Sequence, residues 1–344
     1  MTYQEVLENA RKLLYPKCKV CPVCNGRACA GQVPGVGGIG SGRAFTVCRE
    51  YLDSISIPLD PVHEHWEADP SIELFGRKFS YPFFIAPIGG MPFNYTGALT
   101  EEEYCRATVM GALESGILAF TGDGPLDDYF PSTLPVIREA GGTAVSTIKP
   151  WGDVKIKGRI EDLEETGVLA IAMDLDSAAL RNLRLKGKPA YTKSVEELKS
   201  IISFTGKPFL IKGVMTAKAA LKCAQAGAYG IVISSHGGRI LEDTPAPAAM
   251  ITEIRQAVGS HLKIFVDGGI RSGGDVFKCL ALGADAVLIG RPYAIAAYGG
   301  RQEGVKLYTE RIAGQLKDVM MMTDCRDLKD IDAGKIRFSA SGTN

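Results

Sequence analysis

From about residue 80 onward, short apolar or β-branched runs alternate with segments of helical periodicity. Many of these runs end in Gly, Asp, His or Pro. The eight runs are 83–89, 117–121, 144–148, 169–176, 208–214, 230–236, 263–269 and 286–292. Continuous apolar runs of this length indicate strands buried on both faces, which is the pattern of a parallel sheet.

The segments between the runs predict helices. Ser194 and Glu197 form a capping box that opens a helix ending near Gly206. The segments 216–226 and 275–282 have helical spacing, and a glycine follows each of them. Eight strand–helix repeats in roughly 230 residues predict a (β/α)8 TIM barrel. A doubly wound parallel sheet is the alternative, because a strand count does not prove that the sheet closes.

The first part of the chain lies outside this rhythm, and no linker divides the 344 residues into independent domains. We therefore expect an N-terminal extension with a cysteine cluster (1–75) and a barrel (76–344). Glu5 and Glu8 interrupt the start, which lacks the apolar region of a secretory signal. No apolar run is long enough to span a bilayer. These features predict a cytoplasmic, reducing location.

Charge narrows the expected partners. The chain has 39 Lys and Arg and 39 Asp and Glu, so its formal net charge is zero. This balance argues against nucleic acid or an anionic membrane surface as the main partner. The oligomeric state stays open, a homo-oligomer included. The 40 glycines suggest many tight turns or loops that approach a ligand closely.

In a barrel, chemistry collects at the carboxyl ends of the strands. The polar residues at the predicted strand ends are Asp176, Lys212, His236, Arg239, Asp267, Arg271 and Arg291. Although the chain has no net charge, four cationic residues and a histidine lie at successive predicted strand ends. That pattern suits an anionic ligand in one pocket.

Two glycine-rich turns indicate a phosphate site. Residues 267–274 (DGGIRSGG) and 290–292 (GRP) follow the last two predicted strands, and each turn carries an arginine. Backbone N–H groups in such turns can approach a phosphate closely. Residues 35–40 also match G-x-G-x-x-G, but no strand precedes them and no clear amphipathic helix follows. We interpret them as a flexible loop and not as a dinucleotide site.

The sharpest motif is the turn from His236 to Arg239, which reads His-Gly-Gly-Arg. A histidine titrates near neutrality and can act as a general base. An arginine three residues later can bind a carboxylate bidentately. The turn predicts a base and a carboxylate grip in one place.

With these residues, the stretch 210–292 closely resembles the FMN-dependent α-hydroxy acid dehydrogenases and oxidases, such as glycolate and lactate oxidases. The likeness continues through Ile85–Pro87, through 170–176 and through 322–329, and covers roughly residues 75 to 335. The resemblance implies an FMN enzyme that oxidises a small 2-hydroxy acid to the 2-keto acid. It implies oxygen, a quinone or a protein as electron acceptor without choosing among them.

The resemblance also implies roles for single residues. His236 is the expected base, Asp176 the carboxylate that stabilises its charged form, and Arg239 the substrate-carboxylate ligand. Lys212 is expected beside flavin N1 and O2. The remaining residues implied at FMN are Pro87, Ile88 and Gly89 near flavin N5, Asp267 at the ribityl chain, and Gly269, Arg271, Gly290 and Arg291 at the phosphate.

The chain departs from the family at the substrate. The strand ending in Ser146–Lys149 lacks the tyrosine that family members usually carry there. A second substrate tyrosine normally lies in the N-terminal segment, where Tyr15 is the nearby candidate. Arg181 and Arg184 are candidates for a usual second arginine. Substrate identity is therefore left open.

Four cysteines stand within twelve residues, at Cys18, Cys21, Cys24 and Cys29. Their spacing, C-x2-C-x2-C-x4-C, differs from a bacterial ferredoxin run by one residue in the last gap. Zinc, an iron–sulfur cluster and metal-free thiols all fit. We hypothesise that the segment replaces the N-terminal substrate lid and exchanges electrons with the flavin. Two further functions stay open: an FMN-dependent isomerase of the type 2 isopentenyl diphosphate isomerase kind, and a flavin and cysteine redox sensor or electron-transfer protein.

Overall fold

The computed structural model describes residues 1–339 and contains a closed barrel of eight parallel strands. Its strands are β4 (Phe83–Ile88), β5 (Ala119–Thr121), β6 (Val145–Ile148), β7 (Ala170–Asp174), β8 (Phe209–Val214), β9 (Gly230–Ile233), β10 (Lys263–Asp267) and β11 (Ala286–Ile289). β11 pairs with β4, which closes the sheet. The predicted TIM barrel is confirmed, and the doubly wound alternative is excluded.

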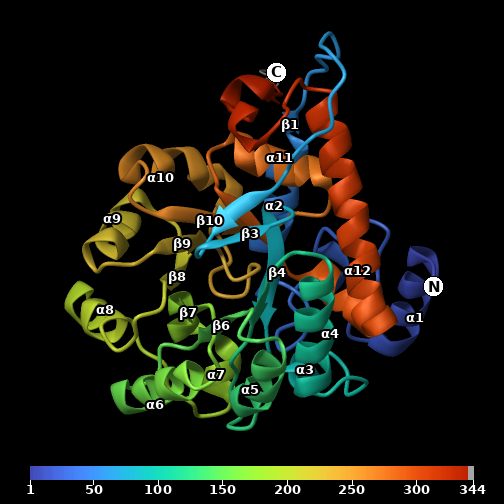
Figure 1. Cartoon of the computed structure of the whole chain (residues 1–344). Coiled ribbons are helices and arrows are strands. Elements are labelled where there is room, and N and C mark those ends of the chain that lie inside the picture. The colour runs from blue at the N-terminus through green and yellow to red at the C-terminus, as the bar shows by residue number, and fades with distance from the viewer. Residues whose placement is uncertain (340–344) are drawn as a thin grey trace.

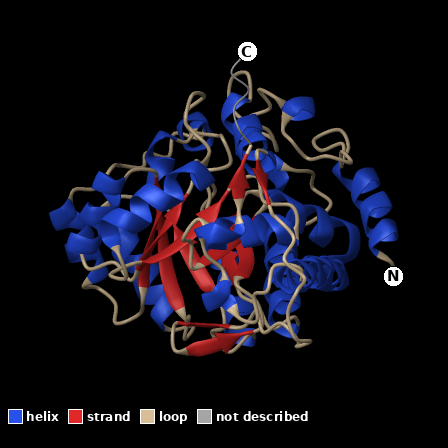
Figure 2. Cartoon of the chain, turned by 90° about the horizontal axis from the view of Figure 1, so that it is seen from above, coloured by secondary structure: helices blue, strands red, loops and turns tan. Residues whose placement is uncertain are grey.

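Helices surround the strands (Figures 1 and 2). The helices that follow β4 are α3 (Met91–Asn94), α4 (Glu101–Glu114), α5 (Tyr129–Glu139), α6 (Asp153–Glu164), α7 (Arg181–Leu185), α8 (Val195–Ile202), α9 (Ala217–Gln225), α10 (Ile251–Val258), α11 (Gly273–Ala281) and α12 (Arg291–Met321). The predicted capping box of Ser194 and Glu197 is present at α8. α11 begins two residues earlier than expected, because Ser272 caps it.

A hairpin of β2 (Ile72–Leu74) and β3 (Arg77–Phe79) covers the amino-terminal end of the barrel. Its Phe75 stacks on Phe265 of β10 at 6.1 Å between ring centroids, and its backbone N–H donates to the Tyr229 hydroxyl that precedes β9. Phe79 packs edge-on against Phe84 of β4. These aromatic side chains fill the barrel from below, so the opposite end is left for a ligand.

The N-terminal extension packs along the barrel. α1 (Tyr3–Leu14) lies beside α12, where Figure 1 shows the blue and orange helices together. α2 (Arg43–Asp53) lies near the turns that follow β9 and β10, and β1 (Ile55–Ser56) pairs with β12 (Arg337–Phe338). No described helix is both long and apolar enough to cross a membrane.

The expectation of a flexible loop at 35–40 is wrong. Val36 is buried, and the Ile39 N–H donates to the Gly238 carbonyl at 2.8 Å. The amphipathic helix that the sequence did not reveal does follow, as α2, with Phe45 and Leu52 buried. No strand precedes the segment, so the structure still lacks the context of a dinucleotide site.

Candidate active site

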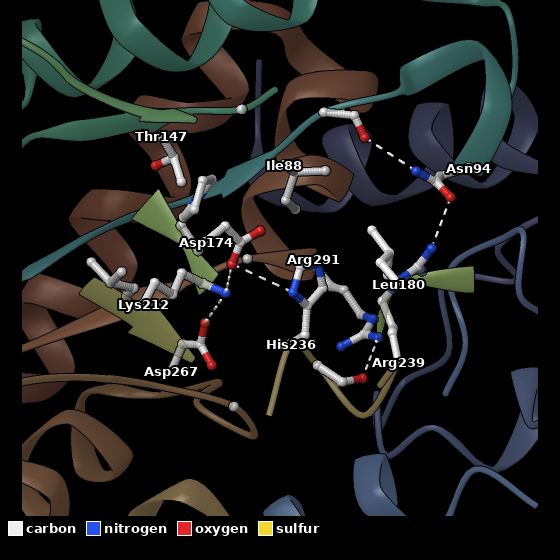
Figure 3. A pocket seen from close by; sticks show the side chains of 18 of the residues that line it. Ile88, Asn94, Thr147, Asp174, Leu180, Lys212, His236, Arg239, Asp267 and Arg291 are labelled. Atoms are coloured by element: carbon white, nitrogen blue, oxygen red, sulfur yellow. Dashed lines mark hydrogen bonds and ion pairs between the residues drawn. The ribbon is translucent and has the colours of Figure 1, made fainter. Parts of the chain in front are cut away.

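A cavity opens at the carboxyl ends of the strands (Figure 3). The sequence-predicted residues that line it are Pro87, Ile88, Gly89, Lys212, His236, Arg239, Asp267, Gly269, Arg271, Gly290 and Arg291. Asp176 is the exception, since it lies behind His236 instead of on the cavity wall. The structure therefore brings together residues that span more than 200 positions of the chain.

His236 is held by two carboxylates. Its Nδ1 lies 3.0 Å from Oδ1 of Asp176 and 3.4 Å from Oδ1 of Asp174. The residue has a φ of 54°, a left-handed conformation that non-glycine residues seldom adopt. Gly213, at φ +93°, makes room for Asp176, because a Cβ there would lie 2.5 Å from that side chain. With Nδ1 committed to the carboxylates, Nε2 is the nitrogen left to accept a proton.

Asp174, which ends β7, is the centre of a buried charge network. Its carboxylate lies 2.5 Å from the Lys149 ammonium and 2.9 Å from the Lys212 ammonium. Burial opposes its ionisation, but His236, Lys149 and Lys212 together hold the pKa of Asp174 well below its usual range. Burial likewise disfavours the charged form of Lys212, yet Asp174, Asp176 and Asp267 outweigh it and raise the Lys212 pKa. Both groups are charged at neutral pH.

The arginines of the cavity have no acidic partner. Within residues 1–339, no carboxylate lies within 4.0 Å of Arg239, Arg271 or Arg291. By contrast, buried Arg49 of α2 is paired with Asp275 at 2.7 Å and with Asp53 at 2.6 Å. Each of these three arginines is half-buried, and a cation withdrawn from water without a counter-charge is costly. An anionic ligand in this cavity would supply the missing charge.

Arg239 shows this need most clearly. It donates to the Gly35 carbonyl and, at 2.8 Å, to Oδ1 of Asn94, as Figure 3 shows for Asn94. Burial, helped by the nearby charge of Arg291, lowers the pKa of Arg239 to about 10. The guanidinium remains charged at neutral pH and has further N–H groups for a ligand.

Several buried polar atoms on the cavity wall also await a partner. Oγ1 of Thr147, Oδ1 of Asn182 and Oδ1 of Asp267 make no hydrogen bond within the described chain. Gly269 and Gly290 present bare backbone beside them. Free acceptors next to glycine turns and arginines suit a ligand with hydroxyl groups and a phosphate. These residues fit the ribityl phosphate of FMN.

The turn after β4 is fixed from behind by Glu101 of α4. Both of its oxygens accept from the Gly90 N–H, at 2.9 and 3.0 Å, and Oε2 accepts from the Met91 N–H at 2.9 Å. Burial raises the Glu101 pKa to about 7, although these N–H groups favour the carboxylate. Glu101 thereby positions the backbone of Ile88 and Gly89 at the cavity.

Three substrate-side expectations fail. Tyr15 is 67% exposed and does not line the cavity, because the chain turns outward after α1; buried Tyr95 lines it instead. Arg181 and Arg184 point to solvent from α7, and the same segment contributes Asn182 and Leu180.

Sequence reasoning missed several cavity residues, among them Asn94, Tyr95, Lys149 and Asp174. Two of them carried a signal. Side chains alternate along a strand, so Thr147 and Lys149 share one face, as do Asp174 and Asp176. Asn94 and Tyr95 lie in the loop after β4, where no periodicity marks them.

Known proteins resemble this chain over most of its length. Residues 185–338 match the FMN-dependent dehydrogenase family. The chain is 42% identical over 303 residues to the peroxisomal (S)-2-hydroxyacid oxidase GLO3 of Arabidopsis thaliana, covering 78% of this chain and 81% of the relative. It is 40% identical over 306 residues to glycolate oxidase of Spinacia oleracea, covering 80% and 82%. A solved mandelate oxidase variant, R163L with 2-hydroxy-phenylacetamide, superposes with a TM-score of 0.80 at 25% identity, covering 98% and 99%.

Proposed function

This chain belongs to the family of FMN-dependent 2-hydroxy acid dehydrogenases and oxidases, and from that premise we propose how its residues oxidise a small 2-hydroxy acid to the 2-keto acid. The family comprises oxidoreductases that act on CH–OH groups and use FMN. The matched relatives are hydroxy acid oxidases, so the isomerase alternative is not favoured.

One observation carries the proposal: Arg239 is half-buried, charged and without a carboxylate partner in the described chain, three residues from a histidine that is tied to carboxylates through Nδ1. A 2-hydroxy acid has both a carboxylate to pair with the arginine and a hydroxyl to donate a proton to the histidine. Its carboxylate pairs with Arg239, and its hydroxyl then faces Nε2 of His236.

His236 takes the hydroxyl proton on Nε2. Asp176 and Asp174 stabilise the imidazolium that forms, because two carboxylates within 3.4 Å of Nδ1 favour the charged ring. Asn94 orients Arg239 from the far side. Bound FMN supplies the chemistry that accepts the two electrons leaving the α-carbon.

The cofactor site follows from the same residues. Lys212 would place a fixed positive charge where electrons arrive. Asp267 would accept from the ribityl hydroxyls through its free Oδ1, and Gly269, Arg271, Gly290 and Arg291 would hold the phosphate. The backbone of Pro87, Ile88 and Gly89 would line the reactive face.

Three further proposals concern the domain organisation, the cellular location and the class of substrate. Residues 1–75 act as a cap on the barrel of 76–344. None of the nine cysteines forms a disulfide in the described chain, which supports a reducing, cytoplasmic setting. The neutral charge supports a small-molecule substrate instead of nucleic acid.

The role of His236 is tested by mixing the FMN-loaded protein with lactate, glycolate and longer 2-hydroxy acids in the absence of oxygen. Flavin bleaching is expected with at least one of them. His236→Ala should slow bleaching about 10²- to 10⁴-fold with FMN still bound, since the base is lost. His261→Ala, at an exposed histidine after α10, is the matched control and should bleach normally. Unchanged bleaching in His236→Ala would show that another group is the base.

A further inference from the structure

The four clustered cysteines line a cavity of their own. Cys18, Cys21, Cys24 and Cys29 all face it and are partly exposed, whereas the other five cysteines are buried. The chain reaches this cavity directly after α1, and the Arg11 guanidinium donates to the Val20 carbonyl to hold the loop against the helix. Four thiols converging on one space form a ligand set.

The four sulfur atoms are not packed as closely as the ligands of a formed tetrahedral zinc site. A tetrahedral zinc site with Zn–S bonds of about 2.3 Å brings its thiolates to about 3.8 Å from one another. In residues 1–339, no three cysteine sulfur atoms lie within 4.8 Å of one another; the one group of ligands that close is Asp174, Asp176 and His236. An iron–sulfur cluster is larger and holds its four thiolates further apart.

The surroundings of the sulfur atoms suit an anionic cluster. Nη2 of Arg271 lies 3.7 Å from Sγ of Cys24, and the Val20 N–H donates to Sγ of Cys18 at 3.4 Å. Arg291, which has no acidic partner, also lines this cavity. Hydrogen bonds and positive charge at the sulfur atoms stabilise such clusters and tune their potentials.

The cysteine cavity and the flavin cavity share a wall. Tyr95 and Arg291 line both of them. Tyr95 is buried and stacks on Tyr298 at 5.6 Å between ring centroids, so packing holds this part of the wall in place. A redox group held by the cysteines would lie directly beside the predicted FMN site.

We propose that Cys18, Cys21, Cys24 and Cys29 ligate an iron–sulfur cluster that takes electrons, one at a time, from the reduced flavin. The relay rests on the proposed function, whereas the metal site does not. Each hydroxy acid releases two electrons and two protons as its C–H and O–H bonds break and the C=O bond forms. In one turnover without an external acceptor, one electron stays on the flavin and one reduces the cluster.

Continuous turnover requires a one-electron acceptor that oxidises the cluster twice for each substrate. The surface of this segment favours an acidic carrier. Arg11 and Lys12 in the last turn of α1, and Lys19 between the first two cysteines, are exposed. Complementary charge of this kind steers association.

The metal site is tested on the full-length protein purified without oxygen. Analysis for iron, acid-labile sulfide and zinc should give iron and sulfide in equal amounts, about two of each per chain for a [2Fe–2S] cluster or about four of each for a [4Fe–4S] cluster, since four cysteines ligate either kind. Reduction with dithionite should produce the electron paramagnetic resonance signal of a reduced cluster. One zinc per chain without iron, or four titratable thiols without metal, would overturn the proposal.

Substitution assigns the ligands. Cys21→Ala should lose most of the iron while retaining FMN and the barrel's circular dichroism. Cys223→Ala, at a buried cysteine of α9 that lines neither cavity, is the matched control and should retain the iron. Full iron in Cys21→Ala and also in Cys24→Ala would exclude these ligands. The metal content of the wild-type protein tests the proposal by itself. The outcome therefore does not depend on whether a cysteine variant folds.

The relay is tested by adding a limiting amount of 2-hydroxy acid to the wild-type protein without oxygen. The cluster signal should appear as the flavin bleaches, and Cys21→Ala should bleach without that signal. Bleaching with an unchanged cluster signal would overturn the relay. If no hydroxy acid bleaches the flavin, the proposed function fails, and the dithionite spectrum still decides the cluster.

Discussion

Lys149 and Asp174 add a buried ion pair to a cavity that already contains His236 and Lys212. Their charged atoms lie 2.5 Å apart, and both side chains are almost fully buried. Lys149 ends the strand where the resembled family usually has a tyrosine. A cation thus stands in place of a hydroxyl, and Asp174 balances it. A buried ion pair without net charge therefore lies where the resemblance implied a neutral hydroxyl.

The contribution of the Lys149–Asp174 ion pair can be tested by measuring the stability of variants. Lys149→Met should lower the free energy of unfolding by about 3–5 kcal/mol, because it leaves the buried Asp174 with less compensation. The double variant Lys149→Met/Asp174→Asn should recover part of that loss. Denaturant unfolding of both variants measures the coupling.

An exposed pair provides the control. Lys155→Met removes an ion pair with Asp127 at the surface and should change stability by about 1 kcal/mol or less. If Lys149→Met lowers the free energy of unfolding no more than Lys155→Met does, the buried network contributes little to the stability of the fold.

Among the elements, the turn between β10 and α11 joins the cavity to the cap. Gly269 has a φ of +81°, and a Cβ there would lie 2.5 Å from the Cys48 carbonyl oxygen of α2. The Arg49 guanidinium donates to the Gly269 carbonyl at 2.6 Å. The absence of a side chain at Gly269 therefore has two effects. It exposes backbone to a phosphate, and it lets α2 approach closely.

Gly269→Ala should weaken FMN binding and lower the melting temperature, because the backbone conformation and the contact with α2 are both strained. Gly274→Ala is the matched control. It lies in the first turn of α11, its nearest contact would be 3.7 Å away, and alanine favours a helix. FMN titration and thermal unfolding compare the two, and equal behaviour would refute the close-contact argument.

The turn after β4 adds a pH-dependent element. Glu101 ionises near 4.5 in its ordinary environment and near 7 in the folded protein, where it is largely buried. Folding therefore favours its protonated form. Its contribution to stability, about 3 kcal/mol at most, is complete below pH 4.5 and is lost as pH rises through 7.

Glu101→Gln should flatten the fall in stability between pH 4.5 and 7, because the neutral amide carries no titrating charge. Thermal unfolding measured at several pH values checks this. Glu114→Gln, at an exposed site of the same helix, should keep the wild-type slope. A wild-type slope in Glu101→Gln would assign the pH dependence to another group.

The elements also show what a sequence can reveal. The eight strands were predictable because doubly buried strands leave continuous apolar runs. The strand-end residues followed, since parallel strands end at one edge of the barrel. Tyr95 and the Gly35 carbonyl were not predictable. Their positions depend on how irregular backbone packs, and a backbone carbonyl that binds Arg239 leaves no trace in residue type.

At the scale of the whole molecule, the N-terminal extension is part of one packed body. Leu14 of α1 is fully buried, and a Cβ on Gly299 of α12 would lie 2.0 Å from the Val6 carbonyl oxygen. α1 and α12 therefore fit backbone against backbone. The extension should unfold together with the barrel.

Leu14→Ala should lower stability by about 2–5 kcal/mol, because it leaves a cavity between α1 and the barrel. Leu13→Ala, at the neighbouring exposed position, should change it by about 0.5 kcal/mol or less. Calorimetry should show one transition, shifted only in Leu14→Ala. A separate early transition would mean that the extension unfolds on its own.

The contacts of residues 35–36 with Arg239 and Arg291 also constrain biosynthesis. The Val36 carbonyl binds Arg291, which lies 255 positions later in the chain. A ribosome that adds about 5–20 residues per second needs about 10–50 seconds to cover that interval. Throughout that time residues 35 and 36 lack the surface on which they dock. The neighbouring cysteines are therefore made long before the barrel turn that packs against this segment, and their thiols are exposed to solvent during that interval.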